Sequence, residues 1–153
     1  MEFPLGEIEG QPLQFYPSAR SGGPSAFAVL VVVWLADEVL LADIPGRGWC
    51  LPSGRIEAGE TPAQAAEREA MEESGAILTH IRQIGHELWG SGKAATCVDV
   101  FVAQLSELRP LPDRSESRGR RLVHRRDLPA VYYEWNPLLE AIFDYAHATG
   151  REL

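Results

Sequence analysis

Hydrophobic residues follow one another without interruption in one segment of the chain, and this segment predicts a buried strand. Residues 26–35 are nearly all apolar, include several β-branched valines and lie between Pro24 and Asp37. A short run of this kind favours a strand that is covered on both faces. Further strands are expected at residues 38–43, 49–51, 77–88, 94–105 and 121–124.

Two other segments carry the start and stop signals of helices. Thr61 is placed to cap a helix whose first residue is Pro62, Gln64 completes a capping box, and Gly75 ends the helix after Ser74. A second helix is expected to start after Asn136 and to end at Gly150. Its apolar face consists of Leu138, Leu139, Ile142, Phe143 and Ala146.

The first 24 residues are rich in proline and glycine, which predicts an irregular N-terminal arm with a short edge strand near residues 13–16. The remainder, residues 25–153, has the length of one domain. Strands, a helix, more strands and a final helix follow in that order. This order predicts an α/β sandwich with a mixed sheet.

Charge is unevenly distributed along the chain. The net charge is −8, and an acidic surface repels the phosphates of nucleic acid, so nucleic acid is not an expected partner. Residues 109–126 nevertheless contain seven arginines against Asp113 and Glu116, a local charge of +5. Two interpretations remain open for this stretch: a solvated loop, or a rim that faces phosphate, with Arg118 as a substrate contact.

The cysteines and the long apolar run limit the metal sites and membrane contacts that the sequence allows. Cys50 and Cys97 lack the neighbouring Cys and His residues of a zinc site, which favours two buried free thiols. The apolar run at residues 25–35 is too short to span a membrane as a helix, so no membrane partner is expected. Residues 1–4 lack the basic start of a signal peptide. A cytoplasmic protein is the expectation.

Three glutamates on the first predicted helix form the clearest candidate for chemistry. Glu69, Glu72 and Glu73 are three and four positions apart, so they share one helical face, where like charges repel. Mg²⁺ removes this repulsion because it binds carboxylate oxygens together with phosphates and water. Arg68 is placed to pair with these carboxylates. The alternative is a solvated acidic face with an ordinary Arg68–Glu72 salt bridge.

The surrounding stretch GRIEAGETPAQAAEREAMEESGA, residues 54–76, resembles the Nudix box. The residues that match its fixed positions are Gly54, Glu60, Arg68, Glu69, Glu72, Glu73 and Gly75. Ala70 and Ala76 are smaller than the aliphatic residues that are frequent in the family, and Ser53 replaces a frequent glycine. The resemblance implies the Nudix fold, an α/β/α sandwich with a central mixed β-sheet.

The resemblance also implies roles for residues of the box. Glu69, Glu72 and Glu73 would bind magnesium (Mg²⁺, with Mn²⁺ as a substitute), helped by the main-chain carbonyl of Ser53. Arg68 would orient the carboxylates, Gly54 and Gly59 would shape the loop, and Glu60 would be mainly structural or an occasional metal partner. Within the box, Glu69 is the candidate general base that takes a proton from the attacking water.

Some members of the family carry the base on a late loop instead. If Leu128-Pro129 is aligned with the Leu-Pro pair that follows this loop, Glu116 takes the place of its first glutamate and Gly119 that of the second. Glu116 is therefore a second candidate for the base or for a metal contact. The alternative is a solvated glutamate without a catalytic role.

The sequence constrains the substrate less than the reaction. Residues that accompany ADP-ribose, dinucleoside polyphosphate or coenzyme A specificity in the family are absent, so a nucleoside triphosphate is the default small nucleotide-like diphosphate substrate. Tyr132 and Trp135, in the loop before the last helix, are candidates for stacking on a base. Phe27 and Trp34 are expected to pack in the core.

Several functional hypotheses thus remain. The leading one is a pyrophosphohydrolase that cleaves a nucleoside diphosphate linked to another group. The alternatives are a hydrolase of ADP-sugars, dinucleoside polyphosphates or RNA 5′ ends, and a non-catalytic nucleotide-binding regulator. A homodimer formed through residues 1–24 is a further prediction.

Overall fold

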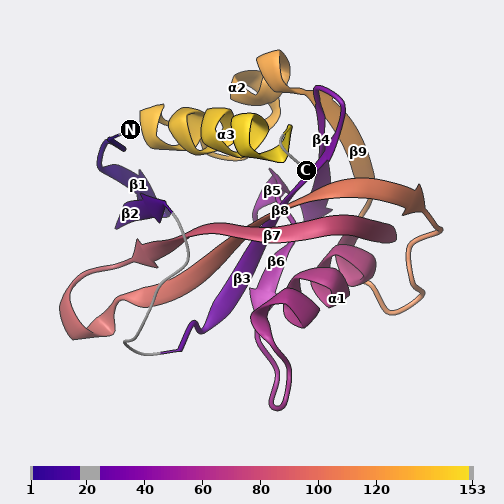
Figure 1. Ribbon diagram of the computed structural model, residues 1–153, viewed down its shortest axis with the longest axis horizontal. Coiled ribbons are helices and arrows are strands. Elements are labelled where there is room, and N and C mark those ends of the chain that lie inside the picture. The colour runs from indigo at the N-terminus through magenta and orange to yellow at the C-terminus, as the bar shows by residue number, and fades with distance from the viewer. Residues whose placement is uncertain (1, 18–24, 152–153) are drawn as a thin grey trace.

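The computed structural model describes residues 2–17 and 25–151 (Figure 1). One mixed sheet carries helices on both of its faces. The strands are β1 (Gly6–Ile8), β2 (Gln11–Pro17), β3 (Ala28–Leu35), β4 (Glu38–Ile44), β5 (Gly48–Cys50), β6 (Ser53–Arg55), β7 (Ala76–Trp89), β8 (Thr96–Leu108) and β9 (Arg120–His124). The helices are α1 (Pro62–Ser74), α2 (Leu128–Val131) and α3 (Pro137–Gly150), with short 3₁₀ turns η1 (Gly92–Ala94) and η2 (Arg125–Asp127).

The central strands are β3 and β8, which run parallel, whereas the other pairs are antiparallel. The main path through the sheet is β1-β2-β7-β8-β3-β4-β5, while β6 pairs with β3 and β9 pairs with β4. Because α1 covers one face and α3 the other, the predicted α/β/α sandwich with a mixed sheet is confirmed (Figure 1).

Helix α1 begins and ends where its sequence signals predict. The Thr61 side chain accepts a hydrogen bond from the Gln64 amide and the Gln64 side chain accepts one from the Thr61 amide, which completes the capping box. Gly75 closes the helix with a φ of 72°, a left-handed conformation that glycine adopts at little cost. The Arg120 side chain also donates to the Ser74 carbonyl and so ties this end to β9.

Alternate residues of β3 belong to two separate cores. Val29, Val31 and Val33 pack with the buried alanines of α1, which are Ala65, Ala66 and Ala70. Val32 and Trp34 belong to the core under α3, with Leu138, Leu139, Ile142 and Phe143. A strand covered on both faces can be apolar along its whole length. This explains the uninterrupted run that the sequence shows.

The N-terminal segment differs from the expected irregular arm. β1 and β2 form a hairpin, and β2 pairs along Leu13 to Pro17 with β7, so this segment extends the central sheet. Leu13 and Phe15 are buried under α3. The expected edge strand at residues 13–16 thus lies inside a longer β2, and residues 18–24 fall outside the described part of the chain.

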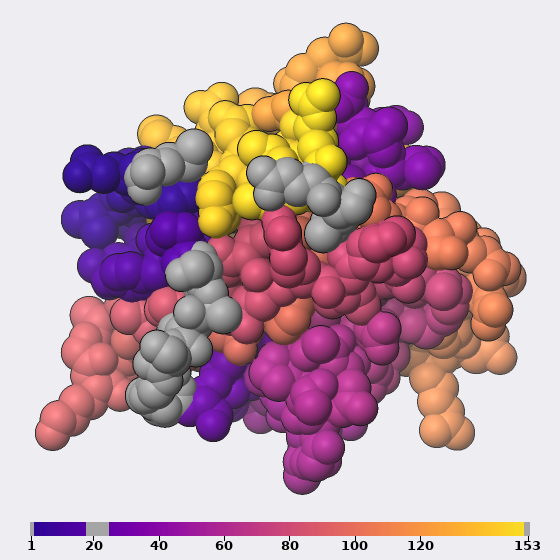
Figure 2. Space-filling model, in the orientation of Figure 1, coloured from indigo at the N-terminus to yellow at the C-terminus, as the bar shows by residue number. Residues whose placement is uncertain are grey.

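The hairpin is fixed to the start of α3, and the two lie side by side in the space-filling view (Figure 2). The Asn136 side chain caps α3 by accepting from the Leu139 amide, and it also donates to the Glu7 carbonyl of β1. Proline at the first position of α3 is compatible with this cap. Among the described helices, none is long and apolar enough to cross a membrane.

Phe15→Ala is expected to lower the free energy of unfolding by about 3 kcal/mol, because it removes a buried ring from the core under α3. Urea denaturation measures the change, with Gln14→Ala, at an exposed neighbour on the same strand, as the matched control. Equal stability of the two variants would mean that β2 is not packed on the sheet.

Candidate active site

The loop before α1 brings Glu60 next to Arg68 of the helix. β6 pairs with β3 from Ser53 to Arg55, and the chain then turns between Glu57 and Glu60. Gly59 has a φ of 79° in this turn, and the Glu57 amide donates to the Glu60 carboxylate at 3.0 Å. The turn therefore returns Glu60 toward the helix face that carries Arg68.

Arg68 binds acceptors from both the loop and the helix. Its Nε and Nη2 donate to the two Glu60 carboxylate oxygens at 2.8 and 3.0 Å, and Nη2 also donates to the Arg55 carbonyl at 2.9 Å. Its Nη1 donates to Glu69 at 2.9 Å and to Glu72 at 3.2 Å. The fork of the guanidinium suits such a set of acceptors. Its hydrogen bond holds the pKa of Glu60 at about 2.

Glu69 lies in close contact with the backbone at Gly54. A β-carbon at position 54 would overlap the Glu69 carboxylate, so only glycine leaves room for it. The Glu69 side chain is 12% exposed, and this burial raises its pKa although Arg68 opposes the shift. The glycine and the arginine together position a carboxylate that is largely removed from water.

Glu73 lies one helical turn further along, next to β6. Its Oε1 accepts a hydrogen bond from the Ser53 amide at 2.7 Å. Burial raises the pKa of Glu73 to about 7, although the Ser53 bond opposes the shift. Glu72, in contrast, is 52% exposed and extends along Arg68.

The predicted metal ligands lie close together but are held by protein donors. In the described part of the chain, no group of three or more His, Cys, Asp or Glu side chains has the arrangement of a metal site. The hydrogen bonds of Glu69 and Glu73 nevertheless involve only Oε1 of each carboxylate. Both pKa values are raised by burial, and a hard divalent cation would relieve this cost. The donor set therefore fits such an ion.

A cavity of about 500 Å³ opens beside Glu73, a volume typical of small-molecule sites. Its outer part is lined by Ser53, Gly54, Glu73 and two arginines, Arg47 and Arg55. Its inner part lies between the sheet and α3 and is lined mainly by apolar and aromatic side chains: Leu13, Leu30, Trp89, Tyr132, Leu139, Ile142 and Phe143. One end of the cavity is thus charged and the other is apolar.

The two aromatic residues proposed for substrate contact have different places. Tyr132 lines the cavity, and its hydroxyl accepts a hydrogen bond from the Leu51 amide at 3.2 Å. Trp135 is not a lining residue of this cavity, because its ring stacks on Phe143 at 5.6 Å and joins the core under α3. The geometry favours Tyr132 over Trp135 as a substrate contact.

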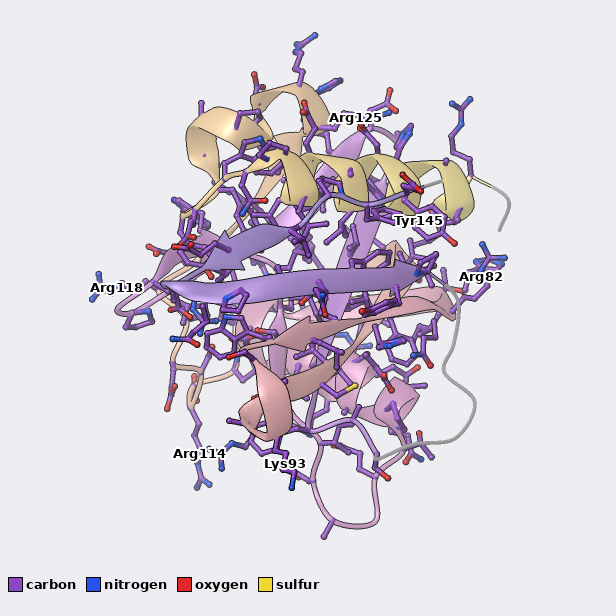
Figure 3. All side chains as sticks on the ribbon, turned by 90° about the vertical axis from the view of Figure 1, so that its left-hand side faces the viewer. Arg82, Lys93, Arg114, Arg118, Arg125 and Tyr145 are labelled. Carbon is purple, nitrogen blue, oxygen red and sulfur yellow. The ribbon has the colours of Figure 1, made fainter. Side chains whose placement is uncertain are left out.

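The arginines of residues 109–126 do not form one phosphate-facing rim. Arg114, Arg118 and Arg125 lie at separate places on the outside of the molecule (Figure 3). Arg118 is exposed and does not line the cavity. Arg125 bonds with Asp144 and His147, and Arg120 ties the end of α1 to β9. The arginines are therefore distributed over several structural contacts.

Sequence reasoning did not single out two residues of the cavity, and it favoured the core for a third. Arg47 and Arg55 line the outer part of the cavity. Arg55 directly follows Gly54 of the matched motif, and this neighbouring position is a signal that could have identified it. Phe27 was expected in the core but is 51% exposed at the cavity, with the Arg55 guanidinium 4.9 Å from its ring centre. Trp34 is buried, as expected.

Glu87, on β7, also lines the cavity, and no sequence motif singled it out. Its side chain lines the cavity although the residue is only 7% exposed. Burial alone raises its pKa to about 7. Glu116, the other proposed base, is exposed on the loop before β9 and does not line the cavity.

Comparison with known proteins identifies a family. The model of the NUDIX domain matches residues 24–144. The NAD-capped RNA hydrolase NudC of Vibrio cholerae is 29% identical over 106 residues, which are 67% of this chain and 39% of that protein. The putative 8-oxo-dGTP diphosphatase YtkD of Bacillus subtilis is 29% identical over 97 residues, 63% of this chain and 61% of that one. The chain thus spans less than two thirds of these relatives.

Solved structures show the same fold. The Bacillus subtilis pyrophosphohydrolase BsRppH superposes with a TM-score of 0.76 at 18% identity, covering 97% of this chain and 96% of that one. The NUDIX domain of Shewanella oneidensis NrtR, solved with ADP ribose, gives a TM-score of 0.66 at 17% identity, covering 84% and 90%.

Arg68→Gln is expected to raise the pKa of Glu60 from about 2 toward its usual value of 4.5, because the guanidinium that stabilises the carboxylate is lost. Carbon-detected NMR of the glutamate carboxyls measures the titration. Arg109→Gln, at an exposed arginine that pairs with Glu107, is the control. A Glu60 pKa that stays near 2 in Arg68→Gln would contradict the bonding described here.

Glu87→Gln is expected to weaken the loss of stability with rising pH. With a folded-state pKa raised to about 7 from 4.5, Glu87 contributes stability that is fully present below the lower value and is lost as the pH rises through the upper one. The wild type should therefore lose up to about 3 kcal/mol more than Glu87→Gln across this window. Urea denaturation at a series of pH values tests this, and parallel curves would contradict it.

Proposed function

The chain belongs to the NUDIX family, and on this premise we propose that it is a divalent-metal-dependent hydrolase that cleaves a diphosphate bond in a nucleotide-like substrate. One observation carries the proposal. Glu69, Glu73 and Arg68 gather on one helical face, and Glu73 lines a cavity large enough for a nucleotide.

The carboxylates of α1 would hold the metal. Glu69, Glu72 and Glu73, with the main-chain carbonyl of Ser53, are the proposed ligands of Mg²⁺, for which Mn²⁺ can substitute. A cation bound there would neutralise charge on the phosphates as water attacks phosphorus. Arg68 would keep Glu69 and Glu72 in place through the bonds that it already makes.

Proton transfer is assigned to one of these carboxylates, and phosphate binding to arginines that line the cavity. Glu69, whose pKa is raised by burial, is the proposed base for the attacking water. Arg55 and Arg47 line the outer part of the cavity, so they are the proposed partners of phosphate oxygens. Arg118 is a weaker candidate for phosphate binding and Glu116 a weaker candidate for the base, because both are exposed and neither lines the cavity.

A nucleoside triphosphate is the proposed substrate class. The aromatic walls of the inner cavity, among them Tyr132 and Trp89, suit the flat face of a base. The similarity to a putative 8-oxo-dGTP diphosphatase supports a free nucleotide. The similarity to NAD-capped RNA hydrolases keeps an RNA 5′ end as the second candidate.

Location and assembly remain predictions from the sequence. A cytoplasmic location stays a prediction, and a homodimer is proposed on the edge that β1 gives to the sheet. Light scattering tests the dimer directly, and a monomer mass would contradict it.

Glu69→Gln and Glu73→Gln are expected to lower kcat for the preferred nucleotide by about 100-fold or more, because each removes a negative ligand or the base. The assay follows release of phosphate and pyrophosphate in Mg²⁺ from nucleoside triphosphates, oxidised nucleotides, ADP-ribose, dinucleoside polyphosphates and RNA with a 5′-triphosphate or an NAD cap.

Glu67→Gln is the matched control, since Glu67 is an exposed glutamate of the same helix. It should retain the wild-type rate. Turnover by neither the wild type nor any variant, despite measurable binding of Mg²⁺, would favour a binding module over an enzyme. A loss in Glu116→Gln as large as that in Glu69→Gln would move the base to the loop before β9.

A further inference from the structure

A buried glutamate lies in the inner part of the cavity. Glu87 belongs to β7, where its backbone pairs with Phe15 of β2 on one side and Val98 of β8 on the other. The residue is only 7% exposed, and its side chain lines the cavity. Two strands therefore fix the backbone of Glu87 from both sides.

The Glu87 carboxyl has no hydrogen bond or ion pair with the described residues. Tyr132 lines the same cavity; burial raises its pKa most, and Glu87 adds a smaller effect than Cys50 and Tyr133 do. The Tyr132 hydroxyl accepts from the Leu51 amide, so its own proton remains to be donated. A buried carboxyl group without a hydrogen-bond partner raises the free energy of the folded protein when no ligand is bound.

We propose that Glu87 recognises the base of the substrate, and that its carboxylate selects guanine by accepting hydrogen bonds from two neighbouring N–H groups. This inference rests on the proposed function, because it assigns the phosphates to the end of the cavity near Glu73 and the base to the end near Glu87. Both glutamates line the same cavity.

The choice of guanine follows from the donors that each base presents. An ionised carboxylate only accepts, and it can take two parallel N–H donors. The Watson–Crick edge of guanine offers two such donors side by side, N1–H and the N2 amino group. Adenine and cytosine offer one donor beside an acceptor, and uracil offers one donor between two acceptors. Guanine therefore satisfies both oxygens of Glu87.

The surroundings of Glu87 suit a flat base, and no cation among the described residues pairs with its carboxyl group. The aromatic side chains of Trp89, Tyr132 and Phe143 line the same space. The Trp89 indole nitrogen donates to the Ile8 carbonyl at 2.9 Å, which fixes this ring. The arginines that line the cavity, Arg47 and Arg55, belong to its outer part, with Ser53 and Gly54. A ligand in this space can thus supply donors for Glu87.

The test measures binding without hydrolysis. Calorimetry at about pH 8 in a metal chelator compares GMP, IMP and AMP, which share ribose and phosphate but differ at the base edge. At this pH the Glu87 carboxyl, whose pKa is about 7, is mostly ionised. The wild type should bind GMP about 10- to 100-fold more tightly than AMP, with IMP, which lacks the N2 amino group, in between.

Glu87→Gln is the decisive variant because it keeps the shape of the side chain and replaces one acceptor by a donor. A glutamine amide pairs with the donor and acceptor of adenine. The variant should therefore lose about 10-fold or more in affinity for GMP and gain affinity for AMP. A gain cannot result from misfolding. Glu107→Gln, at an exposed glutamate of β8, should behave like the wild type.

Three results would overturn the proposal: no measurable binding of GMP by the wild type, equal binding of the three nucleotides, or an unchanged preference in Glu87→Gln. Its failure is distinguishable from failure of the proposed function. Turnover of nucleotides in Mg²⁺ without a preference for guanine would remove the role of Glu87 alone. A clear preference in binding without turnover would remove the hydrolase and leave Glu87 as the group that recognises the base.

Discussion

The rest of the site depends on the hydrogen bonds that the Arg68 guanidinium donates. One guanidinium joins Glu60 and the Arg55 carbonyl of the loop to Glu69 and Glu72 of the helix. Without this central cation, the carboxylates would repel one another and the loop would lose its hydrogen bonds to Arg68. The absence of a side chain at Gly54 then lets Glu69 lie against β6.

The central sheet lies between the charged face of α1 and the core under α3, where the inner part of the cavity has room for a nucleotide base. β3 packs against α1 through one set of side chains and against the core under α3 through the other. The cavity passes from Glu73 and the arginines at its outer part to Glu87 under α3. Both glutamates carry a pKa raised to about 7 by burial, so both ends of the cavity store unfavourable electrostatic energy that a ligand can relieve.

Local patterns predicted the fold well because its elements carry their own signals. The capping box at Thr61, the glycine at Gly75 and the apolar run of β3 each determine a boundary without help from distant residues. Glu87 and Arg47 were missed, and Phe27 was assigned to the core, because their place in the cavity depends on strand register and loop packing across the molecule. The dispersal of the arginines has the same cause. It cannot be foreseen from a local charge of +5.

A crystal structure with Mn²⁺ and a non-hydrolysable guanosine triphosphate tests the central claim most directly, since anomalous scattering locates the metal and the density locates the base. The account predicts manganese between the phosphates and the carboxylates of Glu69 and Glu73, with the guanine edge against Glu87. Metal bound away from α1, or a base that lies outside the cavity under α3, would contradict it.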